Sequence, residues 1–217
     1  MAISYLFDFD GTLVDSMPNY VATMLRILDE NQISYPADIV KIITPLGNGG
    51  TARYFIEQLG LKMEVAQVRA LMGKYILDAY LHTIPAKAHV IEALKELKQQ
   101  GASLNVLTAS PHVVLDPCLK RLGMWELFDN IWSCEDFGTT KTDPEIYRQA
   151  AQRMNTTVEK VLFLDDNYNA DKAAKDAGTL VCGVYDASSE NYVEEIKSVS
   201  DFYIYDFSQL LSLDLGE

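Results

Sequence analysis

The chain has 217 residues, of which 48% are hydrophobic and 23% charged, with 12 glycines and 7 prolines. This composition is typical of a soluble globular protein and excludes collagen-like, low-complexity and disordered chains. At roughly 150 residues per domain, the length predicts one compact unit with a sizeable insertion. Thirty-one acidic against eighteen basic residues give a net charge of −13. That charge repels polymeric nucleic acid and anionic membranes. A small phosphorylated metabolite remains a possible ligand, because it needs only a local group of hydrogen-bond donors.

The cysteines and the first residues of the chain indicate the cellular compartment of the protein. Cys118, Cys134 and Cys182 are odd in number and show no CxxC spacing, which predicts reduced thiols and neither a disulfide framework nor a zinc site. The apolar run at the N-terminus is too short for a signal peptide and has no basic leader. No apolar run reaches the roughly 18 residues of a membrane helix. We expect a cytoplasmic protein that is a monomer or weak dimer.

Strand-like and helix-like segments alternate through most of the chain. Short apolar runs typical of buried strands occupy residues 3–7, 103–107, 161–164 and 180–184, with a weaker run at 130–132. Helical patterns lie at residues 90–99, 113–122, 145–154 and 170–177, and a glycine closely follows three of them. The alternation predicts an α/β fold, a Rossmann-like parallel sheet with helices on both faces. After the apolar-aromatic run 202–205, we expect a final helix in the last fifteen residues.

One long segment breaks this alternation. Residues 17–86 contain helical patterns at 20–31, 38–43, 51–59 and 64–81, a turn over 45–50, and no convincing strand. This segment is long enough to bury a small core of its own. We therefore predict two domains: an α/β core formed by residues 1–16 and 87–217, and an inserted α-helical cap formed by residues 17–86.

The residues directly after the strands are the candidates for chemistry, because ligands of open α/β sheets bind beyond the carboxyl ends of the strands. The first strand is followed by Asp8 and Asp10, and the strand at 161–164 by Asp165 and Asp166. Lys141 precedes a predicted helix start and is placed to reach the same edge. Carboxylates a few ångströms apart repel one another by roughly 4 kcal/mol at an effective dielectric constant near 20, so a cation is expected among them. Oxygen ligands without histidine or cysteine favour Mg²⁺.

A phosphoryl group would suit the same edge of the sheet. Thr108 ends the second predicted strand, and Ser110 follows it at the start of a helix. Free backbone N–H groups and the positive end of the helix dipole make such a helix start a natural phosphate site. The helix start at Ser110, after Thr108, is therefore the predicted phosphoryl-binding site, and Lys141 is placed to reach the same edge.

The order of these segments resembles a known family, the haloacid dehalogenase-like (HAD) hydrolase superfamily. DFDGTLVDS at residues 8–16 is similar to the first motif of the family, and Thr108 after an apolar strand to the second. Lys141 ahead of DPEIY at 143–147 resembles the third motif, and Asp165-Asp166 through Asp171 the fourth. The predicted helical insertion resembles the C1 cap of the phosphoglycolate-phosphatase-like branch.

The resemblance implies a phosphoric monoester hydrolase in which Asp8 is the nucleophile and forms an aspartyl-phosphate. Asp10 would be the general acid that protonates the leaving oxygen and then the base that activates water. Mg²⁺ would be bound by the Asp8 carboxylate, the Asp10 backbone carbonyl and Asp166. Thr108 and Lys141 would hold the phosphoryl oxygens. An aspartate at position 10 favours phosphoryl transfer, because the dehalogenases of the family lack it.

Several alternatives remain open at this point. Asp165 replaces a common glycine, so either Asp165 or Asp166 is the direct metal ligand, and Asp171 either belongs to the site or only stabilises its helix. A phosphosugar mutase of the β-phosphoglucomutase type would use the same residues. A signalling receiver domain is disfavoured, because receivers have about 120 residues and no cap. The substrate is not identified by the sequence. In the cap, the glycine-rich turn 44–51 with Arg53 is the predicted substrate contact; the alternative is that this segment is a plain turn between helices.

Overall fold

The computed structural model describes residues 3–216 and, at Pro45, the backbone alone. Contacts divide the chain into two compact units, Met1–Asp15 with Pro85–Glu217, and Ser16–Ile84. We call them the core unit and the cap unit. The boundaries predicted from the sequence lie at 16/17 and 86/87, and residues 1, 2 and 217 of the predicted core lie outside the described part of the chain.

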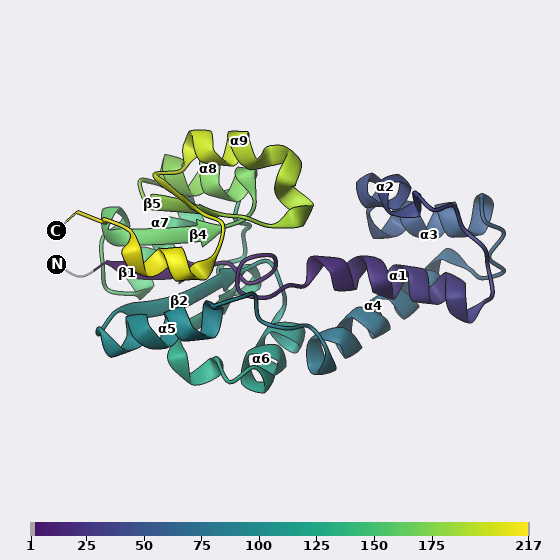
Figure 1. Ribbon diagram of the computed structural model, residues 1–217, viewed down its shortest axis with the longest axis horizontal. Coiled ribbons are helices and arrows are strands. Elements are labelled where there is room, and N and C mark those ends of the chain that lie inside the picture. Colours follow the sequence, from purple (N-terminus) through teal and green to yellow (C-terminus); the bar gives the residue numbers. More distant parts are fainter. Residues whose placement is uncertain (1–2, 217) are drawn as a thin grey trace. The chain divides into compact units, whose positions relative to one another are not determined.

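A six-stranded parallel sheet forms the centre of the core unit (Figure 1). Its strands are β1 (Ser4–Phe7), β2 (Ser103–Thr108), β3 (Asn130–Ser133), β4 (Val161–Asp165), β5 (Leu180–Val184) and β6 (Phe202–Ile204). Their order across the sheet is β3-β2-β1-β4-β5-β6. The predicted α/β fold is confirmed, and the sequence run at 202–205, for which no strand was predicted, adds a sixth strand beside β5.

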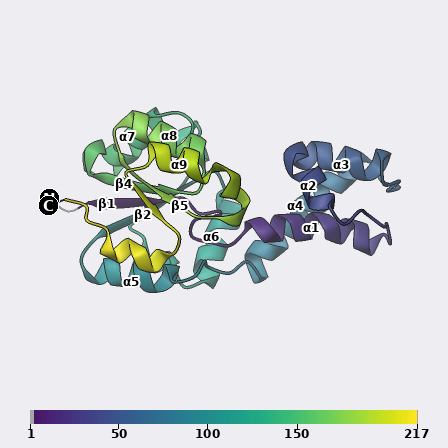
Figure 2. The same cartoon turned by 45° about the horizontal axis from the view of Figure 1, so that its top comes forward.

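Helices cover both faces of this sheet. They are α5 (Val90–Gln99), α6 (His112–Arg121), α7 (Glu145–Arg153), α8 (Tyr168–Ala177) and α9 (Val193–Val199). Both views place α5 and α6 on one face and α7, α8 and α9 on the other (Figures 1 and 2). The sequence analysis did not predict α9. The predicted C-terminal helix is a short 3-10 helix, η6 (Phe207–Ser212), which buries Phe207 and Leu210.

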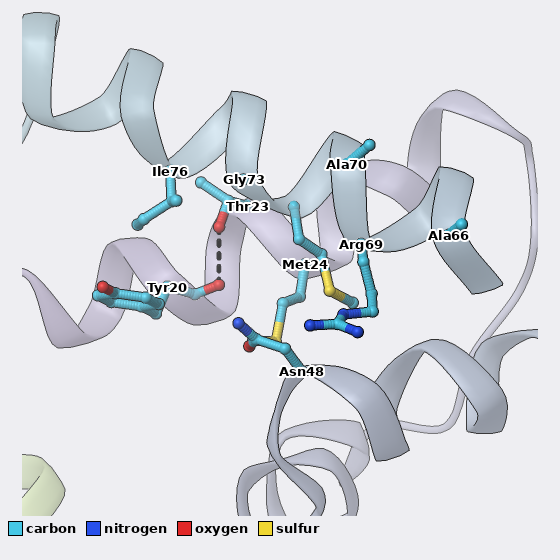
Figure 3. A pocket seen from close by; sticks show the side chains of 10 residues that line it. Tyr20, Thr23, Met24, Asn48, Ala66, Arg69, Ala70, Gly73 and Ile76 are labelled. Atoms are coloured by element: carbon cyan, nitrogen blue, oxygen red, sulfur yellow. Dashed lines mark hydrogen bonds between the residues drawn. The ribbon is translucent and has the colours of Figure 1, made fainter. Parts of the chain in front are cut away.

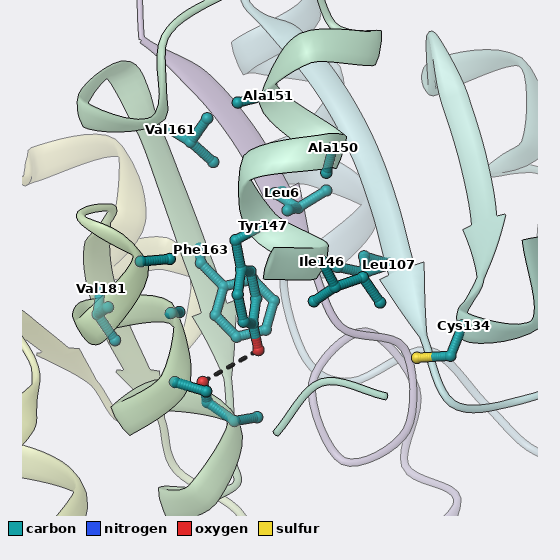
Figure 4. Close-up of a cluster of buried hydrophobic side chains, with 14 residues drawn as sticks. Leu6, Leu107, Cys134, Ile146, Tyr147, Ala150, Ala151, Val161, Phe163 and Val181 are labelled. Carbon is teal, nitrogen blue, oxygen red and sulfur yellow. Dashed lines mark hydrogen bonds between the residues drawn. The ribbon is translucent and has the colours of Figure 1, made fainter. Parts of the chain in front are cut away.

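The face covered by α7 and α8 holds a hydrophobic cluster (Figure 4). Tyr147 of α7 packs edge-on against Phe163 of β4, with ring centroids 4.8 Å apart. Four alanines of α8, at positions 170, 173, 174 and 177, belong to the same cluster. Small side chains allow α8 to lie close to the sheet, so the residues at its N-terminal end stay near the ends of the strands.

The cap unit is entirely helical within the described residues. It comprises α1 (Met17–Glu30), α2 (Ile39–Ile43), the 3-10 helix η1 (Thr44–Leu46), α3 (Gly47–Glu57) and α4 (Val65–His82). Its own core includes Ile27, Leu28, Phe55, Val68 and Met72. Val68 and Met72 lie four positions apart on α4, followed by the buried Tyr75 and Ala79, which is the spacing of one helical face.

The turn predicted over residues 45–50 is largely helical instead. Gly47 alone adopts a positive φ, 60°, where η1 passes into α3, and residues 48–50 already belong to α3. Glycine suits position 47 because a residue without a side chain adopts this positive φ at no steric cost. Among all described residues, no helix combines the length and the apolar character that crossing a membrane requires.

Candidate active site

The functional residues predicted from the first, second and fourth motifs meet at the carboxyl edge of the sheet. Asp8 follows β1 directly, and its N–H donates to the carbonyl of Leu164 at 2.9 Å. Thr108 and Asp165 are the last residues of β2 and β4, the two strands that flank β1. The chain leaves β1 toward β2 and returns on the other side at β4, so this edge is the switch point where open sheets bind ligands.

Three carboxylates crowd this point. Asp8, Asp165 and Asp166 each place one oxygen within 4.8 Å of the others, while Asp8 is 4% exposed and Asp165 is fully buried. The Lys141 ammonium lies 2.5 Å from Asp8 Oδ1 and 2.6 Å from Asp165 Oδ2. One ammonium leaves most of the negative charge of three carboxylates uncompensated, and an all-oxygen donor set of this kind fits a hard divalent cation.

Burial and mutual repulsion change how these groups titrate. Burial, followed by the charge of Asp165, raises the pKa of Asp8 to about 7 despite the opposing ammonium of Lys141. Burial also raises the pKa of Asp166 well above its usual range. For Lys141 burial opposes the charged form, but Asp165 and Asp8 outweigh it and raise the pKa well above the ordinary lysine value. The lysine therefore stays charged, and Asp8 needs further positive charge to be fully ionised at neutral pH.

Asp165 and Asp166 have different surroundings. Both oxygens of Asp165 are engaged, Oδ2 by Lys141 at 2.6 Å and Oδ1 by the N–H of Asn167 at 2.9 Å. Asp166 Oδ1 has the Thr12 hydroxyl at 3.5 Å. The φ of Gly11 is 75°, and a Cβ on Gly11 would lie 2.7 Å from both Asp166 oxygens. The turn after Asp10 thus needs glycine for its backbone geometry and for the room it leaves the Asp166 carboxylate.

Asp10 is joined to the end of β2 through Ser110. The Ser110 hydroxyl donates to Asp10 Oδ2 at 2.5 Å, and the Ser110 N–H donates to Thr108 Oγ1 at 3.0 Å. Helix α6 begins two residues later, at His112. The acid two residues beyond Asp8 is therefore linked to the two hydroxyl residues predicted to bind a phosphoryl group.

Comparison with known proteins places this site in a family. Residues 5–184 match the model of the haloacid dehalogenase-like hydrolases. The chain belongs to this family. It is 29% identical to a phosphoglycolate phosphatase of Salmonella paratyphi A, over 94% of this chain and 89% of the relative. It is 26% identical to a phosphorylated carbohydrates phosphatase of Thermotoga maritima, over 80% of each chain.

A solved structure shows the same fold. A presumed β-phosphoglucomutase of Thermotoga maritima superposes with a TM-score of 0.84 at 24% identity, covering 98% of this chain and 97% of the other. The match of residues 5–184 to the family model confirms the family predicted from the four motifs, and with the phosphatase relatives it confirms the prediction that the chain is a hydrolase of this superfamily.

The structure adds a contact that the sequence analysis of this HAD-like hydrolase missed. The Tyr147 hydroxyl lies 2.8 Å from the carbonyl oxygen of Lys141 and 3.0 Å from that of Ala170. It joins the loop that carries Lys141 to the first turn of α8. The only sequence signal for this role is an aromatic residue six positions after the motif lysine. Asp171, on the same helix, is fully buried, and neither of its oxygens has a hydrogen-bond partner among the described residues.

The cap unit contains a cavity of about 380 Å³ (Figure 3). Its lining residues come from α1, α3 and α4: Tyr20, Thr23, Met24, Asn48, Ala66, Arg69, Ala70, Met72, Gly73 and Ile76. Arg69 extends from α4 toward the side where Asn48 lies at the start of α3 (Figure 3). Arg53, the cap residue predicted from the sequence, is exposed on α3 and does not line this cavity. The lining of the cavity thus combines one cation, one amide and the hydroxyl residues Tyr20 and Thr23 with apolar side chains.

Proposed function

We propose that this HAD-like hydrolase is a Mg²⁺-dependent phosphatase that acts on a small phosphate monoester through an aspartyl-phosphate on Asp8. The observation that carries the proposal is the buried carboxylate of Asp8 between the Lys141 ammonium and a cluster of acids, with Asp10 linked to the same edge of the sheet. The phosphatases among its relatives support the reaction class. We propose in addition that the enzyme is cytoplasmic, in line with its odd number of cysteines without CxxC spacing, and that it is a monomer or weak dimer.

The residues present fit a magnesium ion. Asp8, Asp166 and the backbone carbonyl of Asp10 would hold it, and Asp165 would orient Lys141, because both oxygens of Asp165 are already engaged. A bound divalent ion supplies positive charge that keeps Asp8 ionised and offsets the charge of the phosphoryl oxygens.

The chain's own residues then carry the two chemical steps. Asp8 attacks phosphorus, the bond from phosphorus to the leaving oxygen breaks, and Asp10 gives its proton to that oxygen. Asp10 next takes a proton from water as the water oxygen attacks phosphorus, which releases phosphate and regenerates the Asp8 carboxylate. The Thr108 hydroxyl and the Lys141 ammonium bind phosphoryl oxygens in both steps, with their positions set before the reaction begins.

The test of this proposal is phosphate release from a panel of phosphate monoesters, including phosphoglycolate and sugar phosphates, with purified protein and Mg²⁺. We expect stoichiometric free phosphate and the dephosphorylated alcohol from at least one small ester. A mutase would instead return the phosphoryl group to the sugar. Recovery of an isomeric sugar phosphate without free phosphate would overturn the phosphatase proposal in favour of the mutase.

We further propose that residues of the cap unit choose among phosphate esters, since the residues assigned to chemistry all lie in the core unit. Arg69→Ala, which removes the cation of the cap cavity, is expected to lower kcat/KM for the best ester by tenfold or more, and for a small aryl phosphate by less than threefold. Arg53→Ala, the matched removal of an arginine outside the cavity, tests the residue predicted from the sequence.

The ratio of kcat/KM for the two substrates decides between these residues. A change of ratio in Arg53→Ala alone would assign specificity to the part of α3 around Arg53 and not to the cavity. Equal losses on both substrates in both variants would contradict a role of either arginine in substrate choice.

A further inference from the structure

Two segments of the core unit are paired directly behind the catalytic turn. Val14 and Ala86 form an antiparallel bridge, the Asp15 N–H donates to the Pro85 carbonyl at 3.0 Å, and the Lys87 N–H donates to the Leu13 carbonyl at 3.0 Å. These are the segments where the chain leaves the core unit and returns to it. The backbone of Lys87 is therefore fixed against the end of the turn that begins at Asp8.

The side chain of Lys87 makes three hydrogen bonds within the core unit. Its ammonium donates to the carbonyl oxygens of Gly11 and Tyr185, each at 2.6 Å, and to Asp186 Oδ2 at 3.0 Å. The side chains are only 18% exposed for Lys87 and 5% for Asp186. Three donors on one ammonium meet three acceptors, so the group is fully satisfied. It joins the turn after β1, 76 positions before Lys87, to the loop after β5, 98 positions after it.

The hydrogen bond from Lys87 to the Gly11 carbonyl connects this lysine with the candidate catalytic residues. Gly11 is bonded to Asp10, and its Cα lies against the Asp166 carboxylate, where a Cβ would come within 2.7 Å of both oxygens. The orientation of the peptide bond after Gly11 therefore affects the position of Asp10 on one side and the space for the Asp166 carboxylate on the other. Asp186 also adds negative charge near Asp166, and the Lys87 ammonium offsets that charge at 3.0 Å.

We propose that Lys87 is a positioning residue for the reaction proposed above: by holding the Gly11 carbonyl and Asp186 together, it keeps the turn that carries Asp10 in register with Asp166. The inference rests on the proposed function, because Asp10 and Asp166 matter in this way only if they take part in phosphoryl transfer. Lys87 itself contacts no reacting group. Its effect is expected on kcat, since substrate and transition state differ in their need for an aligned acid.

Lys98 serves as a matched control that separates an effect on the position of catalytic residues from an effect on stability alone. Lys98 contacts Asp129, and Asp129 Oδ2 accepts the Leu104 N–H at 3.1 Å. Leu104 is the second residue of β2, so this pair lies near the amino edge of the sheet, away from the catalytic residues. Lys87→Met and Lys98→Met each remove one ammonium and one ion pair, but only the first frees the Gly11 carbonyl.

The experiment measures kcat and KM for phosphate release from the best ester, together with the thermal midpoint of each variant. Rates are expressed per folded molecule, with the folded fraction taken from circular dichroism, so a partly unfolded variant remains informative. We expect Lys87→Met to lower kcat at least tenfold with KM changed less than threefold, and Lys98→Met to change neither by more than twofold. Lys87→Arg, which still offers N–H donors and a positive charge, is expected to recover several-fold of the lost kcat.

Equal kcat values in Lys87→Met and Lys98→Met would overturn the inference, and so would a failure of Lys87→Arg to exceed Lys87→Met. Absence of phosphate release by the unsubstituted protein, with every ester tested, would contradict the proposed function itself. The two failures are therefore distinguishable in one set of assays.

Discussion

Asp8→Asn is expected to release no measurable phosphate from any ester, whereas Asp10→Asn retains the nucleophile and is expected to slow turnover by roughly 10²–10⁴. The amide of asparagine cannot form the acyl phosphate, but the general acid at position 10 only assists departure of the leaving oxygen and activation of water. Steady-state phosphate release measures both effects. Asp176→Asn serves as control, since Asp176 pairs with Lys172 on the exposed side of α8.

A direct observation of the intermediate supports the same assignment. Acid-quenched protein from the Asp10→Asn reaction is expected to carry one phosphoryl group on the peptide that contains Asp8, detected by mass spectrometry, because the step that needs the base is slowed. Turnover by Asp8→Asn within tenfold of the unsubstituted protein would exclude Asp8 as the nucleophile. A phosphoryl group found on another residue would also contradict the proposal.

Removal of divalent cations is the second large effect. A chelator is expected to abolish phosphate release, and Mg²⁺ in excess to restore it, because one lysine faces the three carboxylates of Asp8, Asp165 and Asp166. Asp166→Asn is expected to raise the Mg²⁺ concentration needed for half-maximal activity more than tenfold. Full activity in metal-free buffer would contradict the site.

The same cation is expected to change the pH dependence of stability. In the metal-free protein the pKa of Asp8 is about 7, above its ordinary value of 3.8. The folded state therefore binds a proton more readily than the unfolded state, and this contribution to stability is present below pH 3.8 and lost as the pH rises through 7. Protons also compete with a cation for the carboxylates. Mg²⁺ is thus expected to raise the thermal midpoint more at pH 8 than at pH 5, and equal shifts would count against the cluster as its binding site.

The gathering of the candidate site residues at one edge of the sheet was largely predictable from the sequence. Parallel strands end at a common edge, so the residues directly after apolar runs, Asp8, Thr108 and Asp165, could be assigned to one place without knowing any side-chain contact. The residues of each motif are close together in the sequence. The order in which they follow a strand is therefore the same in the folded protein. The strand pattern likewise predicted the parallel sheet, with the exception of the short β6 at its margin.

Only the tertiary structure decided which side chains meet across that edge. Engagement of Asp165 Oδ2 depends on Lys141, 24 positions away, and Lys87 donates to carbonyl groups 76 and 98 positions away in sequence. In the cap, Arg69 and not Arg53 lines the cavity, because the packing of α1, α3 and α4 sets which face of each helix is covered. Sequence spacing specifies the faces of single helices and the order of strands, whereas the pairing of distant side chains follows from how those elements pack, which no local pattern encodes.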